Sequence, residues 1–231
     1  MYVKIQMQHN IVMYGGDTVS DDKETKERLL ESAKTEFAEN GYMKASLRKI
    51  CAGAGVTTGA LYFFFKDKED LFTAIVEQPF NGLKEIMLLH FADERELLTS
   101  SDMSKLKEHI DDGHDEIAAA LIHHLYSNYD AFTLLLTKSQ GSKFEGCVDE
   151  IVEMTENVYC AMAENMAKML PNTRVNTYMR HWLTHMIIDA FIHLFTHERD
   201  EQKALSNMRK IMNFLVKGWA EMILVPDEGS N

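Results

Sequence analysis

The sequence predicts an all-α protein with a small three-helix domain at its N-terminus and a larger helical domain after it. Three observations support this fold class. Only three prolines and twelve glycines occur among 231 residues, while strong helix formers such as Leu, Met, Ala, Glu and Lys are abundant. Apolar residues recur three and four positions apart along most of the chain. Two short helical segments joined by a glycine turn follow a longer helix within residues 21–68.

The first predicted helix covers SDDKETKERLLESAKTEFAENG. Asp21 and Glu24 have the spacing of a capping box, Ser20 is an alternative N-cap, and Gly41 is a typical stop. Apolar residues recur on one face of this helix, namely Leu29, Leu30, Ala33 and Phe37. The helix is therefore expected to pack that face against the rest of its domain.

Two short helices and a longer one complete the N-terminal pattern. Ser46 is the predicted N-cap of LRKICAGA, and a turn at Gly55 separates this helix from TGALYFFF, which Thr57 caps. Asp67 caps the longer helix, and Pro79 is expected to end or kink it. Short helices separated by a glycine turn are typical of a helix-turn-helix.

The composition becomes acidic and rich in methionine after Pro79, and further helices are expected at 81–98, 103–126, 129–138, 144–170, 175–198 and 201–224. The chain is thus divided into an N-terminal extension, a helix-turn-helix domain, a larger helical domain and a frayed tail. Their residues are 1–20, 21–68, 69–225 and 226–231.

The charge distribution is uneven. The chain has a net charge of −12, but residues 41–68 hold five basic residues and one acidic residue, a local charge of +4. The rest of the chain therefore carries −16. A basic segment on an acidic body still attracts phosphates at short range, so the acidic total does not exclude nucleic-acid binding.

Other features exclude several protein classes. Three cysteines without C-x-x-C spacing indicate a reduced, cytoplasmic protein rather than a disulfide framework or zinc ribbon. No apolar run reaches the roughly 18 residues of a membrane span, and the N-terminus does not resemble a signal peptide. No phosphate loop, nucleophile elbow or catalytic dyad occurs, so we predict no enzyme activity, no cofactor and no membrane partner.

Residues 28–76 resemble the DNA-binding domain of TetR-type (TetR/AcrR-like) transcriptional regulators along their whole length. The matching residues are Phe37, Gly41-Tyr42, Ser46, Ile50, Ala54-Gly55-Val56, Gly59-x-Leu61-Tyr62-x-x-Phe65 and Lys68-Glu69-x-Leu71. The resemblance implies a helix-turn-helix DNA-binding domain on a larger helical domain that binds a ligand and dimerises. The chain departs from the family pattern at three positions. Family members usually have polar residues or histidine where this chain has Phe63 and Phe64, and they often have alanine where it has Cys51.

The DNA-binding candidates lie around the second and third helices. Thr57 and Thr58 are at the start of the recognition helix, where free N–H groups and the helix dipole favour a phosphate or base edge. The resemblance implies that Tyr62 contacts a phosphate. The alternative is that Thr57 only caps and Tyr62 only packs. The full candidate set is Lys44, Ser46, Arg48, Lys49, Thr57, Thr58, Gly59, Ala60, Tyr62, Phe63 and Lys68.

Helical geometry separates the two adjacent phenylalanines, since successive residues of a helix point about 100° apart. Leu61 and Phe65 define the inward side of the third helix. We expect Phe64 to be mostly buried near Phe37, and Phe63 to project toward DNA or solvent.

The last two long helices carry a dimerisation signal. Apolar residues follow 3-4 spacing in one helix and cover most sides of the other, so that something beyond the domain is expected to cover them. The candidate interface is Trp182, Met186, Phe191, Met208, Met212, Leu215, Trp219 and Met222. The alternative is that both helices belong to the core of one chain.

A histidine stripe offers a different function. His181, His185, Asp189 and His193 stand four residues apart, followed by His197. Such pairs occur in metal sites, and the alternative function is a helical metal-binding protein or metal-dependent enzyme. However, the stripe rotates by about 40° at each step and lacks a Glu in an H-E-x-x-H arrangement. Hydrogen-bonded histidines at an interface or pocket rim are favoured, and no metal is predicted.

The methionines and aromatic residues of the body indicate an adaptable apolar pocket, although core packing explains each of them individually. The weak candidate ligand set is Tyr126, Tyr129, Phe132, Met154, Tyr159, Met162, Met166 and His185. Glu153, Glu156 and Glu164 would favour a cationic amphiphile if they faced inward; solvated surface carboxylates are the alternative.

The function expected from the sequence is a ligand-responsive transcriptional regulator, a repressor. Its partners would be a palindromic double-stranded DNA operator, a second copy of the chain and an apolar or amphiphilic small molecule that releases the DNA. The resemblance implies two recognition helices placed about 34 to 36 Å apart in successive major grooves.

Overall fold

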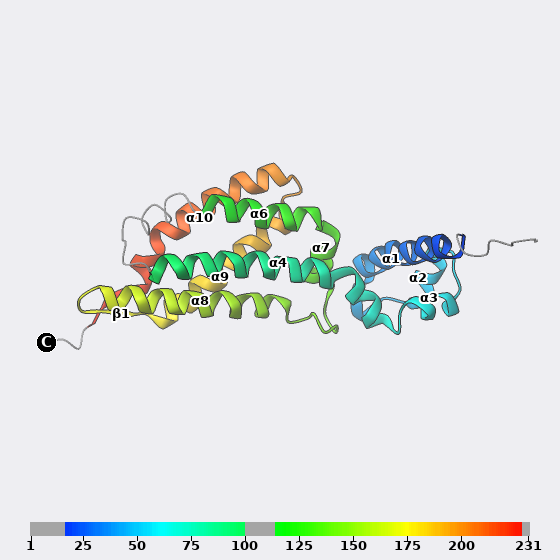
Figure 1. Ribbon diagram of the computed structural model, residues 1–231, viewed down its shortest axis with the longest axis horizontal. Helices are drawn as coiled ribbons and strands as arrows, with labels where there is room; N and C mark the ends of the chain where they lie inside the picture. Colours follow the sequence, from blue (N-terminus) through cyan, green and yellow to red (C-terminus); the bar gives the residue numbers. More distant parts are fainter. Residues whose placement is uncertain (1–16, 100–113, 228–231) are drawn as a thin grey trace, which may run out of the picture.

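The computed structural model describes residues 17–99 and 114–227, and it is helical apart from turns and one short pair of strands. Within these residues the helices are α1 (Asp17–Lys44), α2 (Leu47–Ala54), α3 (Thr58–Phe64), α4 (Lys68–Thr99), α6 (His114–Ser127), α7 (Tyr129–Lys138), α8 (Cys147–Met169), α9 (Thr177–His197) and α10 (Glu201–Ile223). Helices α1–α3 form one end of an elongated molecule, and α4 runs from them into a body formed with α6–α10 (Figure 1). The predicted all-α, two-part fold class is confirmed.

The start of α1 differs from the prediction. The helix begins at Asp17, four residues before the expected Asp21, and therefore includes the last residues assigned to the extension. Gly41 interrupts it with φ 70°, and one more helical turn follows to Lys44. The expected apolar face is buried: Leu29, Ala33 and Phe37 have no solvent-exposed surface.

The turn between α2 and α3 has the predicted chemistry. Gly55 has φ 67°, a left-handed conformation that side chains disfavour, and its N–H closes the end of α2. Thr57 Oγ1 accepts a hydrogen bond from the N–H of Ala60 at 3.2 Å, as expected of an N-cap. Ser46 stands at the N-cap of α2, but its side chain accepts no capping hydrogen bond. Its own N–H instead donates to the buried carboxylate of Glu36.

Helix α4 corrects the expected break at Pro79. Asp67 caps the helix as predicted, with its Oδ1 accepting from the N–H of Asp70 at 2.8 Å. The helix then continues through Pro79 to Thr99, so the separate helix expected at 81–98 is the second half of α4. Proline removes one backbone donor from a helix. We attribute the continuity to tertiary packing, because α4 lies against α6, α7 and α8.

The helices α4 and α6 approach closely beside this proline. Nε2 of His124 on α6 lies 2.8 Å from the carbonyl oxygen of Pro79 and donates to it. Gly82, almost one turn further along α4, faces the same ring, because a Cβ atom built at Gly82 would lie 2.7 Å from His124 Cε1. The glycine is therefore required by the contact between these helices.

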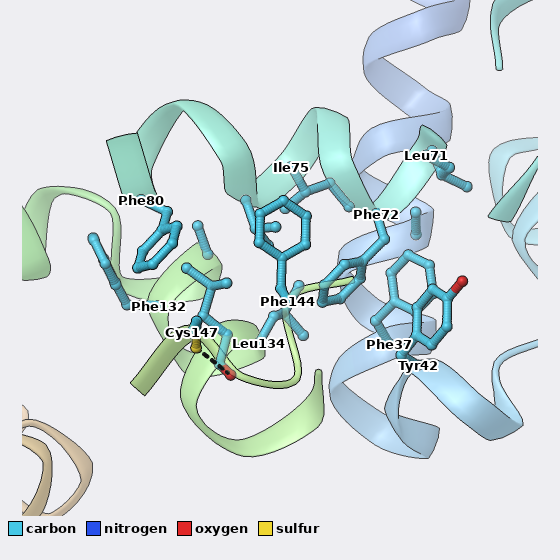
Figure 2. Packing of buried hydrophobic residues seen from close by; sticks show 14 of the residues in the cluster. Phe37, Tyr42, Leu71, Phe72, Ile75, Phe80, Phe132, Leu134, Phe144 and Cys147 are labelled. Carbon is cyan, nitrogen blue, oxygen red and sulfur yellow. Dashed lines mark hydrogen bonds between the residues drawn. The ribbon is translucent and has the colours of Figure 1, made fainter. Parts of the chain in front are cut away.

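The aromatic core is continuous between the two parts of the chain (Figure 2). Phe72 at the start of α4 meets Phe37 of α1 edge to face, with ring centroids 5.0 Å apart, and Tyr42 at 5.2 Å. On its other side Phe72 lies 6.2 Å from Phe144, which precedes α8. The orientation of α1–α3 on the body is therefore fixed partly by one cluster of rings.

A short antiparallel pair of strands, absent from the prediction, lies at the end of the body far from α1–α3 (Figure 1). Strand β1 (Thr173–Val175) pairs with β2 (Leu224–Pro226), Arg174 being opposite Val225. The N–H of Asp227 also donates to the carbonyl of Asn172. The tail predicted to fray from residue 226 is therefore ordered through Asp227. Residues 103–113 of an expected helix lie outside the described residues, and the rest of it is α6.

Candidate nucleic-acid interface and internal cavity

Most of the candidate DNA-binding residues lie on the surface around α2 and α3. The exposed ones are Lys44, Arg48, Lys49, Thr57, Thr58, Gly59, Tyr62 and Phe63. Ala60, Ser46 and Lys68 are half-buried. Within the described residues, the basic side chains at 44, 48 and 49 form no ion pair with a carboxylate, so their charges are available to an anion. Lys66, absent from the predicted set, is exposed beside them.

The two unusual phenylalanines separate as helical geometry predicts. Phe63 is 73 % exposed, and Tyr62 beside it is 56 % exposed. Phe64 packs against the buried cluster but is half-buried rather than mostly buried. Its nearest aromatic neighbours are Phe63, edge to face at 4.9 Å, and Phe65 at 6.5 Å. The α3 surface therefore presents an unusually apolar face for contact with base methyl groups or sugar edges.

Lys68 has a structural role that the sequence did not indicate. Its Nζ donates to the carbonyl oxygens of Tyr42 at 2.7 Å and Met43 at 3.1 Å, and it lies 4.6 Å from the centre of the Tyr42 ring. The ammonium thus satisfies carbonyls at the end of α1, where positive charge is favourable. A DNA contact by Lys68 stays a prediction, and it would be shared with this role.

A polar joint between the small domain and the body was also missed. The carboxylate of Glu69 accepts a hydrogen bond from the Tyr42 hydroxyl at 2.8 Å and from the N–H of Lys143 at 3.3 Å. Burial, and then the hydrogen bond to Glu69, raises the pKa of Tyr42 to about 12. No sequence signal pairs these residues, because they are far apart in the chain and belong to different elements.

This joint predicts sensitivity to alkali. A tyrosine whose folded pKa is raised from 10.0 to about 12 contributes stability below pH 10 that is lost as the pH rises toward 12. Tyr42→Phe is therefore expected to reduce the fall in unfolding free energy between pH 9.5 and 11.5, measured by urea titration. Tyr178→Phe, which removes an exposed phenol, is the control. Equal alkaline losses in the wild type and Tyr42→Phe would contradict the prediction.

A partly open cavity of about 210 Å³ lies in the body between α4, α6, α7, α8, α9 and α10. Four of the predicted ligand residues line it: Phe132, Tyr159, Met162 and Met166. The other cavity walls are formed mainly by aliphatic and aromatic residues that the sequence did not single out. They include Phe80, Leu83, Met87, Phe91, Leu121, Ile187, Phe191, Met212, Leu215 and Trp219. The 3-4 spacing of apolar residues in the second half of α4 was the sequence signal that could have identified the lining residues of that helix.

The other four predicted ligand residues do not line the cavity. Tyr126 and Tyr129 pack with Phe195 and donate their hydroxyls to backbone carbonyls at the end of α9. Met154 does not line the cavity, although Thr155, the next residue of α8, does. The ring of His185 lies beside that of His181, with centroids 4.6 Å apart.

Comparison with known proteins identifies the N-terminal part of the chain. Residues 29–75 match the family described as bacterial regulatory proteins, tetR family. These residues form a tetR-family domain. The repressor BepR of Brucella suis biovar 1 (strain 1330) is 41 % identical over 71 residues, which cover 31 % of this chain and 34 % of BepR. The regulator AcrR of Shigella flexneri is 39 % identical over 71 residues, covering 31 % and 33 %. The chain thus spans about a third of the length of these relatives.

Solved structures resemble the chain beyond its tetR-family domain. A transcriptional regulator of Aquifex aeolicus VF5 superposes with a TM-score of 0.51 at 24 % identity, covering 83 % of this chain and 99 % of that one. A TetR family regulator of Chloroflexus aurantiacus J-10-FL gives 0.55 at 14 % identity, covering 88 % and 94 %. These similarities show that the body following the tetR-family domain has the fold of such regulators.

Two residues of the predicted dimer stripe are buried within the one chain. Met208 has no exposed surface and Leu215 only 8 %, because α10 packs against α6 and the cavity. Phe191, Met212 and Trp219 line the cavity of the same chain. Met186 packs in a small core cluster with Leu183 and Ile223.

Other apolar residues of α9 and α10 do face outward. Trp182 and Met222 of the predicted set are 44 % and 38 % exposed. Tyr178 on α9 and Phe214 on α10, which are outside the predicted interface set, are 72 % and 78 % exposed. A residue beside a regular stripe is exposed when the stripe itself is buried.

The histidine stripe forms two separate pairs on α9. Beside the His181–His185 pair described above, the rings of His193 and His197 stack with centroids 4.0 Å apart. His181 Nδ1 is 3.1 Å from a carboxylate oxygen of Glu156. In residues 17–99 and 114–227, no three side chains of His, Cys, Asp or Glu come together as a metal site would require. The alternative metal-dependent function is not supported. The same ranges contain no helix long and apolar enough to cross a membrane.

Proposed function

We propose that this protein is a ligand-responsive transcriptional repressor of the cytoplasm that binds a palindromic operator as a dimer and releases it when a small molecule enters the cavity. The observation that carries the proposal is the course of α4. Its first turns lie in the core of the tetR-family domain, through Leu71 and Phe72, and its later turns line the cavity through Leu83 and Met87. A single helix thus connects the candidate DNA surface to the candidate ligand site.

The DNA surface supports the first half of the proposal. Exposed Lys44, Arg48 and Lys49 supply positive charge toward phosphates, which position a protein on DNA. Thr57, Thr58 and Phe63 on the exposed side of α3 are left to contact base edges. The acidic body carries the opposite charge and disfavours contact with the DNA elsewhere.

The contact between α4 and α6 supports the ligand response. Cavity walls belong to both helices, and the His124–Pro79 hydrogen bond joins them where α4 leaves the small domain. A ligand that binds better when α4 and α6 stand further apart shifts the orientation of the tetR-family domain. A difference of a few kcal/mol between the two states is enough to change operator occupancy substantially.

The test is selection of an operator from a random duplex library, followed by fluorescence anisotropy with the selected duplex. We expect a palindrome with two half-sites about one helical turn apart. Recovery of no enriched sequence would contradict DNA-binding regulation. Recovery of an operator that no cavity ligand releases would contradict only the ligand response.

The salt dependence of binding gives a residue-level prediction. Arg48→Ala is expected to reduce the slope of log K against log salt by about one unit for each phosphate that is no longer neutralised, because fewer counterions are released. Lys168→Ala, an exposed change at the far end of α8, is the control and should leave the slope unchanged. An unchanged slope in Arg48→Ala would remove that residue from the interface.

A further inference from the structure

The cavity described above is lined without formal charge. Among the lining residues that the structure describes there is no Asp, Glu, Lys or Arg. The acidic residues of α8 that would attract a cation do not line the cavity. Glu153 and Glu164 are exposed, and Glu156 is hydrogen-bonded to His181. The condition for a cationic amphiphile, inward-facing carboxylates, is therefore not met. A charged group placed in this cavity would lose its water without gaining a counter-ion.

The polar groups of the lining are few and mostly occupied. Cys147 donates its thiol hydrogen to the carbonyl of Leu135, and burial raises the pKa of that thiol to about 11. Thr155 Oγ1 donates to the carbonyl of Ile151 at 2.8 Å. His90, the one basic side chain among the described lining residues, already interacts within the protein. The cavity therefore offers neither a reactive thiolate nor a free ionic partner.

One donor next to the cavity has no partner. The indole nitrogen of Trp219 is buried and forms no hydrogen bond among the described residues. Buried polar groups are usually satisfied. A ligand that carries an acceptor oxygen would satisfy this donor once the Trp219 side chain turns to bring its nitrogen to the cavity surface. A neutral acceptor meets this need without the cost of burying a charge.

We propose that the cavity selects uncharged, largely apolar molecules with a neutral oxygen acceptor, and that it discriminates against both cationic and anionic amphiphiles of the same shape. This inference rests on the proposed function for the role of the cavity, and it specifies the chemical class of the ligand. The discrimination comes from the lining itself, since size and apolar surface would be equal for charged and uncharged members of one series.

The test compares 1-decanol, decylammonium and decanoate at pH 7.5 with the full-length protein and no DNA. Trp219 is one of two tryptophans, so Trp182→Phe makes it the only tryptophan reporter, inside the cavity wall. We expect the fluorescence of Trp219 to change saturably as 1-decanol is added. Decylammonium and decanoate should both bind at least about a hundredfold more weakly. Shortening to octanol should weaken binding about four-fold for each CH₂ removed.

A charge exchange tests the cause. Met162→Glu places a carboxylate in the lining, and decylammonium should then bind more tightly than 1-decanol; Met162→Lys should favour decanoate in the same way. Met154→Glu is the matched control, because Met154 is also a half-buried methionine of α8 but does not line the cavity. Circular dichroism melting of each variant confirms that it is folded. If Met162→Glu does not fold, Met166→Glu at the next lining position gives the same comparison.

The outcomes separate this inference from the proposed function. Tighter binding of decylammonium or decanoate than of 1-decanol by the Trp182→Phe protein, or no saturable binding of 1-decanol, overturns the inference. Binding of 1-decanol with the expected discrimination, but without release of the selected operator, supports the inference and contradicts the ligand response.

Discussion

Replacing Phe72 with alanine is expected to lower the free energy of unfolding by about 3–5 kcal/mol, the usual loss for deleting a buried phenylalanine. Phe72 has no exposed surface, and its ring contacts Phe37 and Tyr42 on one side and Phe144 on the other. The substitution leaves a cavity where α1, α4 and the segment before α8 meet. Urea unfolding followed by circular dichroism measures the loss.

Phe63→Ala is the matched control, since it removes the same side chain from the exposed surface of α3. We expect its unfolding free energy to stay within about 0.5 kcal/mol of the wild type. Its preference among operator sequences should relax instead, because the substitution removes an aromatic side chain that we propose faces the bases. A loss below about 1 kcal/mol in Phe72→Ala would show that the aromatic cluster does not hold the two parts together.

The paired change Trp182→Glu and Phe214→Glu is expected to convert the protein to monomers and to weaken operator binding at least about a hundredfold. Both side chains are exposed apolar surface on the last two helices, which we propose pair with the same helices of a second copy. Two linked recognition helices gain from a high effective concentration at the second half-site, and a monomer loses that gain. Sedimentation velocity and fluorescence anisotropy measure the two effects.

Leu89→Glu on α4 is the control for this pair, because it places a charge at a different exposed apolar residue of the body. Leu89 is 70 % exposed. It should leave the sedimentation coefficient unchanged. A double variant that still sediments as a dimer would exclude the outer faces of α9 and α10 from the interface. Substitution of Leu215 would not test the same point, since that side chain is buried in the chain and lines the cavity.

The helix-turn-helix could be predicted from sequence because its signals are local. The left-handed turn at Gly55 and the caps at Thr57 and Asp67 each involve residues within a few positions of one another. The exposure of Phe63 also followed from helical geometry alone. For this reason the DNA-binding candidates could be named from the sequence, although their contacts with DNA stay predictions.

The rest depended on contacts between distant residues. A 3-4 apolar stripe shows that a face is covered but not what covers it, and Met208 is covered by α6 rather than by a second chain. Pro79 indicated a helix end, but packing on three other helices maintains α4. Strands of three residues such as Thr173–Val175 are too short to give a periodic signal.

The glycine at position 82 has a consequence for how far the spacing between α4 and α6 can vary. Because a single added methyl group would already overlap the His124 ring, Gly82 sets the smallest separation that α4 and α6 can reach beside Pro79. A side chain there would act as a permanently inserted wedge, holding the two helices in the spread arrangement that we assign to the ligand. In the ligand response that we propose, a side chain at residue 82 would therefore hold the protein in a single state, without any change in the DNA surface or the cavity.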